Sequence, residues 1–171
     1  TNHTHVKKDT KTIVQHLSEI GYEVVLAGKS HVGPYNTFAW DYYIQNKNNK
    51  QLDIESIDNY LKNVKKPFCL VLASDFPHGP YPNETDYNLD DIKKLSRKIP
   101  KLDILINNAG TAFRAKNHFI NFQEIININL CAPYYLSSLF LNKLKKSKRP
   151  SIINISSINA HLGFPKNPGY V

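Results

Sequence analysis

The chain has no methionine and only two cysteines among its 171 residues. Because no start residue is visible, we expect the sequence to be a fragment. Cys69 and Cys131 lie in apolar surroundings and form neither a disulfide framework nor a metal-binding spacing. The sequence also lacks a secretory signal and an apolar run long enough to cross a membrane. We therefore expect a cytoplasmic protein that has no membrane partner and no bound metal.

Positive charge is in excess, with a formal net charge of +8, and this raises the question of nucleic-acid binding. Most of the basic residues are scattered along the chain. The densest run, Lys143 to Arg149, falls at the end of a predicted helix, where cations favour the negative end of the helix dipole. No nucleic-acid motif accompanies this run. We interpret it as a solvated surface and expect no nucleic-acid partner.

Apolar residues follow the periods of alternating strands and helices. Short apolar runs predict four buried strands, at Val24–Ala27, Phe68–Ala73, Ile104–Ile106 and Ser151–Ile155. Helical spacing predicts four helices, at residues 13–20, 54–64, 90–99 and 122–146. A further strand is expected near Phe38–Tyr43. This alternation is typical of an α/β fold with a mainly parallel sheet and helices on both faces, in which the last two strands are neighbours.

Two patterns in the N-terminal half occur in a characteristic order. Residues 21–33 read Gly-Tyr-Glu-Val-Val-Leu-Ala-Gly-Lys-Ser-His-Val-Gly, and residues 76–81 read Phe-Pro-His-Gly-Pro-Tyr after a predicted strand. The first run resembles the second sulfatase signature, and the second resembles the same family's strand followed by a Pro-His-x-Pro loop. Val24 departs from the signature, where the family usually has Ser or Thr. The resemblance covers about residues 8–91.

By this resemblance, Lys29, His31 and His78 take catalytic roles in sulfate ester cleavage, supplying positive charge and protons to the leaving oxygen. The alternative is that the two histidines are ordinary polar loop residues. The family's nucleophile is the cysteine of a Cys-x-Pro-Ser-Arg motif. Cys131-Ala132-Pro133 copies its first three positions, but two tyrosines follow, and the triplet lies inside a predicted helix. The family's acidic calcium ligands are absent too, so we expect no calcium and no turnover here.

The C-terminal half carries three other motifs in register. Residues 102–110 read Leu-Asp-Ile-Leu-Ile-Asn-Asn-Ala-Gly, Asn129 stands in Asn-Ile-Asn-Leu, and thirteen residues separate Ser157 from Tyr170. This pattern closely resembles the short-chain dehydrogenases, in which the Asn-Asn-Ala-Gly turn lies beside a nicotinamide cofactor. The resemblance runs from about residue 93 to 171. It implies a Rossmann-like fold, and it implies cofactor contacts at Asn107, Ala109 and Gly110.

The same resemblance implies a hydride-transfer site. Tyr170 would exchange a proton with the substrate oxygen, Ser157 would hydrogen-bond that oxygen, and the backbone carbonyl of Asn129 would hold a water. The helical partner of that carbonyl would be the N–H of residue 133, which is a proline. The carbonyl would then be free for the water. The alternative reading of Pro133 is an ordinary helix kink.

Parts of the dehydrogenase pattern are missing. The Gly-rich phosphate loop and the acidic ribose selector should precede residue 93, where sulfatase-like sequence stands instead. Gly28 and Gly33 do not form a Gly-x-Gly-x-x-Gly loop, and the family's lysine, four residues after the tyrosine, would lie beyond Val171. The resemblance therefore implies NAD(P) as cofactor, but without a diphosphate cradle, and it does not distinguish NAD from NADP.

These resemblances predict a composite α/β chain. Residues 1–91 form a sulfatase-like part, and residues 92–171 form a short-chain-dehydrogenase-like, Rossmann-like part. The first functional hypothesis is a degenerate or truncated NAD(P)-dependent oxidoreductase that is inactive in this form. By resemblance, its substrate would be a small molecule. The second is a fragment of a sulfuric ester hydrolase that acts on a sulfate ester. The third is a non-catalytic relic or an artefact of gene joining.

Overall fold

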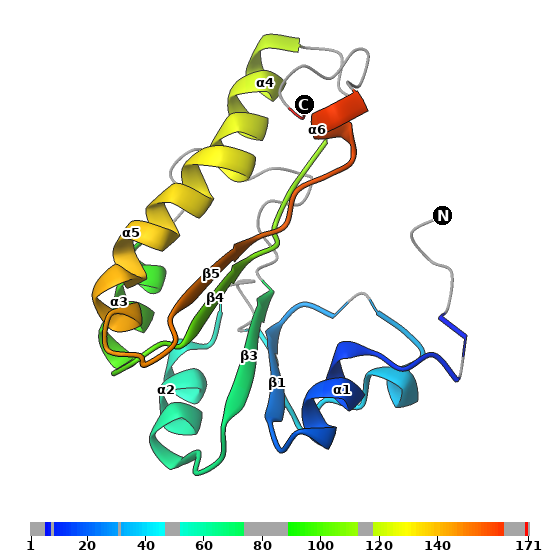
Figure 1. Ribbon diagram of the computed structural model, residues 1–171, viewed down its shortest axis with the longest axis vertical. Coiled ribbons are helices and arrows are strands. Elements are labelled where there is room, and N and C mark those ends of the chain that lie inside the picture. The colour runs from blue at the N-terminus through cyan, green and yellow to red at the C-terminus, as the bar shows by residue number, and fades with distance from the viewer. Residues whose placement is uncertain are drawn as a thin grey trace. The chain divides into compact units, whose positions relative to one another are not determined.

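The computed structural model describes residues 6–7, 9–30, 32–46, 52–73, 89–112, 118–162 and 170 (Figure 1). The chain divides into two compact units, Thr1–Lys98 and Ile99–Val171. Every described strand pair is parallel, and helices flank the strands in each unit. The predicted α/β class is therefore confirmed. The described strands form two sheets, one in each unit, where the sequence predicts one.

The sheet of the first unit has the order β2-β1-β3. Its strands are β1 (Glu23–Gly28), β2 (Tyr42–Ile44) and β3 (Phe68–Ala73). The central strand is buried from Val24 onward, as its unbroken apolar run predicts. The outer strand β3 is in the predicted place, but it is not buried. Phe68 and Leu72 are 36% and 38% exposed, because β3 has a hydrogen-bonded neighbour on one side only among the described strands.

Three helices accompany this sheet, at α1 (Ile13–Glu19), α2 (Ile54–Asn63) and α3 (Leu89–Lys98). The side chain of Asp53 accepts a hydrogen bond from the N–H of Ser56 at 3.2 Å and caps α2. Helix α1 buries Val14, whereas Ile13 in the same helix is 55% exposed and Ile20, just after it, is 69% exposed.

The strand predicted near Phe38–Tyr43 lies later in the chain. Residues Tyr35–Phe38 form the 3-10 helix η1, which follows Pro34, and the strand β2 begins at Tyr42. Two side chains of the first helix hold the 3-10 turn in place. The hydroxyl of Thr12 and the amide of Gln15 donate to the carbonyl of Thr37 at 3.1 Å and 2.8 Å. These are tertiary contacts, which the strand-like pattern of aromatic residues does not reveal.

The second unit contains β4 (Ile104–Asn107), β5 (Ser151–Asn154) and the short helix α6 (Asn159–Leu162). The two strands pair in parallel, so the prediction that they are neighbours is confirmed. One face of the pair packs against α5 (Ala132–Leu144), which runs alongside it in Figure 1. The opposite face carries Ile104, Ile106 and Ile153, each more than 40% exposed. Cover on both faces was predicted, and the described residues do not provide it here.

The predicted helix at 122–146 is present, but it is not one regular α-helix. It consists of α4 (His118–Ile126), the π-helical turn η3 (Asn127–Cys131) and α5. The N–H of Ala132 donates to the carbonyl of Asn127, five residues earlier, instead of four. The change of pattern falls directly before Pro133, which has no N–H to give. The sequence signals this irregularity through the proline, but it does not specify its form.

Candidate functional site

The turn that follows β4 is anchored by Asn107, which is 7% exposed. Its side-chain amide donates to the side-chain oxygen of Asn154 at 2.8 Å and lies 3.4 Å from the hydroxyl of Ser137. One side chain therefore ties together β4, β5 and α5 at the C-terminal end of the strand pair. The side-chain oxygen of Asn107 is buried and accepts no hydrogen bond from the described residues.

Asn129 holds the same turn from the helix side. The N–H of Thr111 donates to its side-chain oxygen at 2.9 Å, and its amide donates to the carbonyl of Thr111 at 3.0 Å. The oxygen also lies 3.7 Å from the place that a Cβ on Gly110 would take. One predicted cofactor-side residue, Gly110, therefore lies beside the predicted helix residue Asn129. Both the oxygen and the nitrogen of the Asn129 side chain bond to the backbone of Thr111, so the water expected at Asn129 would fall to its backbone carbonyl.

That carbonyl lies within the π-helical turn. In this pattern a carbonyl pairs with the N–H five residues ahead, so Pro133 need not leave the carbonyl of Asn129 without a partner. Whether the carbonyl of Asn129 is free therefore depends on where the helix returns to the α pattern. That this carbonyl is free to hold a water stays a prediction.

Ser157 follows β5 by three residues and is half-buried. Its hydroxyl oxygen accepts a hydrogen bond from the N–H of Asn159 at 3.3 Å, and its carbonyl accepts from the N–H of Ala160 at 3.1 Å. Ser157 therefore lies just before α6 and accepts hydrogen bonds from its first two residues. Tyr170 is half-buried as well, but residues 163–169 and 171 lie outside the described part of the chain. The convergence of Asn129, Ser157 and Tyr170 stays a prediction.

In the first unit, Lys29 directly follows the central strand. Its backbone N–H donates to the carbonyl of Ala73 at 2.8 Å, so it lies at the C-terminal edge shared by β1 and β3. Gly28, just before it, has φ +110°, and a Cβ there would lie 1.9 Å from the same carbonyl oxygen. His31 and His78 lie outside the described residues. The two strands are parallel neighbours, as the prediction requires, but the clustering of the three residues stays a prediction.

Sequence reasoning missed several residues of these two edges. Asn46, two residues past the end of β2, places its side-chain oxygen 3.2 Å from the position of a Cβ on Gly28. Thr111, Ser137 and Asn154 are the partners of the two motif asparagines described above. Asn154 carries a usable signal, because it is a polar residue inside an apolar strand run. The others lie in stretches whose sequence gives no such signal.

The described part of the structure contains neither a metal-ligand cluster nor a membrane-spanning helix. Among its residues, no group of three or more His, Cys, Asp and Glu side chains is placed to hold a metal ion. None of the described helices is both long and apolar enough to cross a membrane. Cys131 is exposed and ends the π-helical turn, so the Cys-Ala-Pro triplet does lie within a helix.

Comparison with known proteins decides the family. A family model described as short chain dehydrogenase matches residues 85–171, which is half of the chain. The chain belongs to the short chain dehydrogenase family. The match includes the strand β4, the Asn-Asn-Ala-Gly turn, the π-helical turn and Ser157. The contacts of Asn107 and Asn129 described above therefore lie within the part of the chain that matches the family model.

Individual relatives match parts of the chain. The 3-oxoacyl-(acyl-carrier-protein) reductase FabG of Rickettsia felis is 39% identical over 87 residues, which are 48% of this chain and 34% of the reductase. The enzyme of that name from Buchnera aphidicola subsp. Schizaphis graminum is 30% identical over 113 residues, 64% of this chain and 42% of its own length. A solved structure described as a short chain dehydrogenase/reductase family protein covers 86% of this chain, with 20% identity and a TM-score of 0.47.

A relative from another family also matches. The ulvan-active sulfatase of Formosa agariphila is 43% identical over 97 residues, which are 54% of this chain and 20% of the sulfatase. The chain therefore spans well under half of the reductases and of the sulfatase that it resembles.

Proposed function

We propose that residues 92–171 are a truncated or degenerate NAD(P)-dependent oxidoreductase part, joined to a sulfatase-derived part at 1–91, and that the chain has no turnover as it stands. Membership of the short chain dehydrogenase family implies a nicotinamide cofactor and a small-molecule substrate. One observation carries the proposal. The amide of Asn129 holds the backbone of Thr111, next to Gly110, so the turn expected beside the nicotinamide is held by the residue expected to serve the proton relay.

The chemistry proposed for this part is proton transfer at a substrate oxygen. Tyr170 would give or take the proton, and the hydroxyl of Ser157 would hydrogen-bond the oxygen. The carbonyl of Asn129 would hold the water that exchanges protons with the site. Asn107, Ala109 and Gly110 would form the wall against the nicotinamide ring. The cofactor, when bound, supplies the hydride.

The described residues of the first unit do not fit a dinucleotide diphosphate. In this family's fold a glycine-rich turn after the first strand lets the backbone approach the phosphates. The glycine that ends the central strand here, Gly28, faces a different neighbour. A Cβ on Gly28 would strike the carbonyl of Ala73, so its lack of a side chain serves strand packing. We therefore expect no measurable turnover.

The second candidate is a sulfuric ester hydrolase fragment. The similarity to the ulvan-active sulfatase supports it, together with the position of Lys29 at the C-terminal edge of two parallel strands, where α/β proteins bind ligands. It lacks a nucleophile motif in the sequence, so binding is expected without cleavage. The third candidate, a relic of joined genes without activity, predicts neither binding nor cleavage.

Two activity assays and a melting measurement test the proposed loss of turnover and of cofactor binding. Purified protein is tested for NADPH- and NADH-dependent reduction and for arylsulfatase activity, with an intact family reductase and an intact sulfatase as positive controls. We expect background rates in both. NADPH at about 1 mM should shift the melting temperature by no measurable amount, because a dissociation constant above about 10 mM yields less than about 0.1 kcal/mol of stabilisation. A clear shift with either cofactor would overturn the proposed loss of the cradle.

Histidine chemical shifts followed during sulfate titration test the second candidate. Movement of the His31 and His78 signals at millimolar sulfate, lost in a Lys29→Ala variant, would favour a surviving sulfate site. Unchanged chemical shifts would favour the third candidate, a relic without binding or activity, for the first unit.

A further inference from the structure

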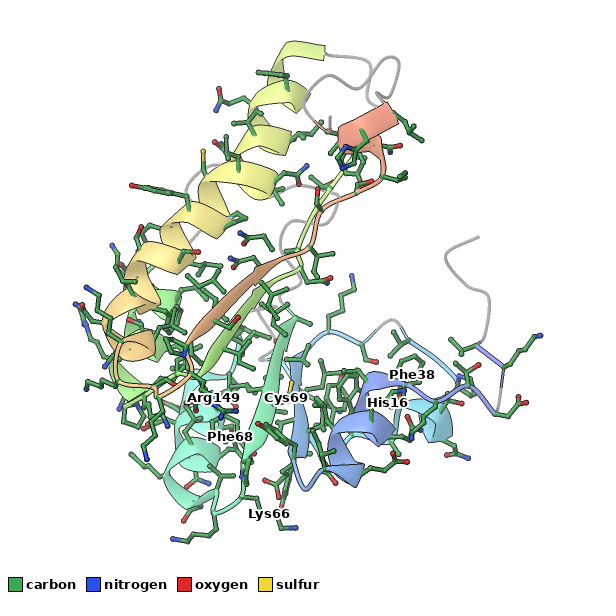
Figure 2. The ribbon with its side chains drawn as sticks, viewed as in Figure 1. His16, Phe38, Lys66, Phe68, Cys69 and Arg149 are labelled. Carbon is green, nitrogen blue, oxygen red and sulfur yellow. The ribbon has the colours of Figure 1, made fainter. Side chains whose placement is uncertain are left out.

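A cluster of cations lies in the loop between α5 and β5. The basic loop, residues 145–149, carries Lys145, Lys146, Lys148 and Arg149, all exposed. Figure 2 labels Arg149 at this loop. Within the part of the chain that the structure describes, no carboxylate pairs with Lys145, Lys148 or Arg149. The neighbouring carboxylate, Asp103, is already bonded to Ser147 and to Lys101. The positive charge of the loop is therefore available to a partner.

The basic loop is held in one conformation by its own hydrogen bonds. The N–H of Ser147 donates to the carbonyl of Leu144 at 2.8 Å, and the N–H of Arg149 donates to the hydroxyl of Ser147 at 3.1 Å. The side chain of Lys146 donates to the carbonyl of Pro100 at 3.2 Å. A partner that binds here would order side chains rather than a whole loop, which lowers the entropy cost of association.

An apolar pocket of about 180 Å³ adjoins the basic loop. Its lining residues are Leu141, Leu144, Lys145, Pro150, Ser151 and Ile152. Leu144 is 2% exposed and forms the floor, whereas Leu141 and Ile152 are 44% and 40% exposed and form open walls. A cavity of about 150 Å³ is known to hold one benzene molecule, so this pocket has room for one large apolar side chain.

The pocket and the basic loop lie away from the proposed oxidoreductase residues. They adjoin the first residue of β5, whereas Asn107 and Asn154 end β4 and β5 (Figure 1). The helix dipole explains Lys143 in the last turn of α5, but it does not explain cations beyond the helix end or the pocket beside them. This surface therefore needs an explanation of its own.

We propose that this surface binds an acidic segment of a partner protein, whose carboxylates face the basic loop while one large apolar side chain fills the pocket. Carboxylates complement the unpaired cations, and a single buried anchor within a charged rim is the usual arrangement of a protein contact. A nucleic acid fits less well, because neither the loop nor the pocket offers an aromatic ring for base stacking. A lipid surface fits less well, because the apolar part is one small hollow.

A synthetic peptide with one leucine between two pairs of glutamates, blocked at both ends, is a direct probe. Titrated into labelled full-length protein at about 50 mM salt, it should shift amide signals of residues 141–152, with a dissociation constant in the millimolar range. Raising the salt to about 200 mM should weaken binding at least threefold, because exposed charges are screened over about a Debye length. The same peptide with serine in place of leucine should bind at least fivefold more weakly.

Variants locate the site. The triple variant Lys145→Gln, Lys148→Gln, Arg149→Gln should weaken binding at least tenfold. A matched triple variant on the first unit, Lys65→Gln, Lys66→Gln, Arg97→Gln, removes the same charge from exposed positions and should change it less than twofold. The proposal would be overturned if about 5 mM peptide shifted no amide signals, or if the leucine and serine peptides bound with equal affinity. Equal losses of affinity in the two triple variants would overturn it as well. So would tighter binding of a DNA oligonucleotide or of phosphatidylserine vesicles at residues 141–152.

Discussion

Gly28 occupies a position where any side chain would collide with backbone. It has φ +110°, and an added Cβ would lie 1.9 Å from the carbonyl oxygen of Ala73. Gly28→Ala should therefore destabilise the first unit by about 2–4 kcal/mol, through backbone strain and overpacking together. Trp40 is the chain's single tryptophan and lies in this unit, so its fluorescence during urea unfolding reports the effect.

Gly21→Ala is the matched control for this substitution. Gly21 also has a positive φ, +86°, but nothing lies within 4 Å of its added Cβ. It should cost only the backbone strain, about 1 kcal/mol. Equal losses in the two variants would mean that the contact with Ala73 has no effect of its own.

Tyr60 illustrates how burial and a carboxylate act together on one side chain. Its hydroxyl donates to Glu23 at 2.8 Å, and its ring contacts Tyr42 and Phe68. Burial first, and the Glu23 carboxylate second, raise the pKa of Tyr60 well above its usual value of about 10. The folded state therefore favours neutral Tyr60, and this stabilisation is complete below about pH 10 and is lost as pH rises above it.

Absorbance at 295 nm measures this shift. Tyr60→Phe should leave the number of tyrosines that ionise near pH 10 unchanged, because Tyr60 does not ionise there in the folded protein. Glu23→Gln should lower the pKa of Tyr60 but leave it raised, because burial is the larger cause. A loss of one titrating tyrosine near pH 10 in Tyr60→Phe would contradict the prediction.

The pair of hydrogen bonds between Asn129 and Thr111 makes a prediction about local opening. Each such bond contributes about 1 kcal/mol. Asn129→Ala should therefore speed amide hydrogen exchange at Thr111 by tenfold or more. Asn129→Asp keeps an acceptor for that N–H and should preserve most of the protection. Equal exchange at Thr111 in both variants and in the parent chain would show that the side chain does not hold the turn.

At the scale of elements, the period of the sequence places four of the five described strands and most described helices correctly. The run at Val24–Ala27 is buried as its composition indicates, and Asp53 caps the next helix as its position before an apolar face indicates. The burial of the outer strands could not be predicted in this way. Apolar composition shows that a strand can be buried, but which strands are covered depends on sheet order. Phe68 and Ile106 are apolar and exposed for that reason.

Pro133 tests whether the π-helical turn depends on the proline. Pro133→Ala restores an N–H that can donate to the carbonyl of Asn129, so residues 127–131 should return to the α pattern. The helix should gain about 1 kcal/mol or more, since proline is strongly unfavourable inside helices. The realignment should turn Asn129 away from Thr111, so Thr111 exchange becomes faster while the helix becomes more stable. The prediction would be contradicted if the variant kept the π-helical hydrogen bonds, in which an N–H donates to the carbonyl five residues earlier.

At the scale of the whole molecule, motifs predict which residues belong to the candidate site but not their partners. Asn107, Gly110 and Asn129 were all predicted from sequence, and the structure places Gly110 beside Asn129 and bonds Asn107 to Asn154. Thr111 and Ser137 were not, because a side chain acquires hydrogen-bond partners only when distant elements pack. The motif residues are recognisable without the fold, whereas their contacts exist only within it.

The two units should differ in stability, because their cores differ in size. The first unit buries a central strand and one residue or more from each of α1, α2 and α3, whereas the described apolar core of the second unit is Ile99, Ile125, Phe140 and Leu144. The second unit's described sheet has two strands and exposed isoleucines on one face, which is close to the lower limit for independent stability. It should therefore unfold at a lower urea concentration.

Trp40 fluorescence follows the first unit, and amide signals of residues 104–107 and 151–154 follow the second. We expect the amide signals to be lost before the fluorescence changes. Gly28→Ala should move the fluorescence transition toward lower urea and leave the amide transition in place, while Leu144→Ala should do the reverse and cost about 2–5 kcal/mol in the second unit. Coincident transitions that move together in both variants would show that the chain unfolds as one cooperative body, so the division into two units would have no energetic meaning.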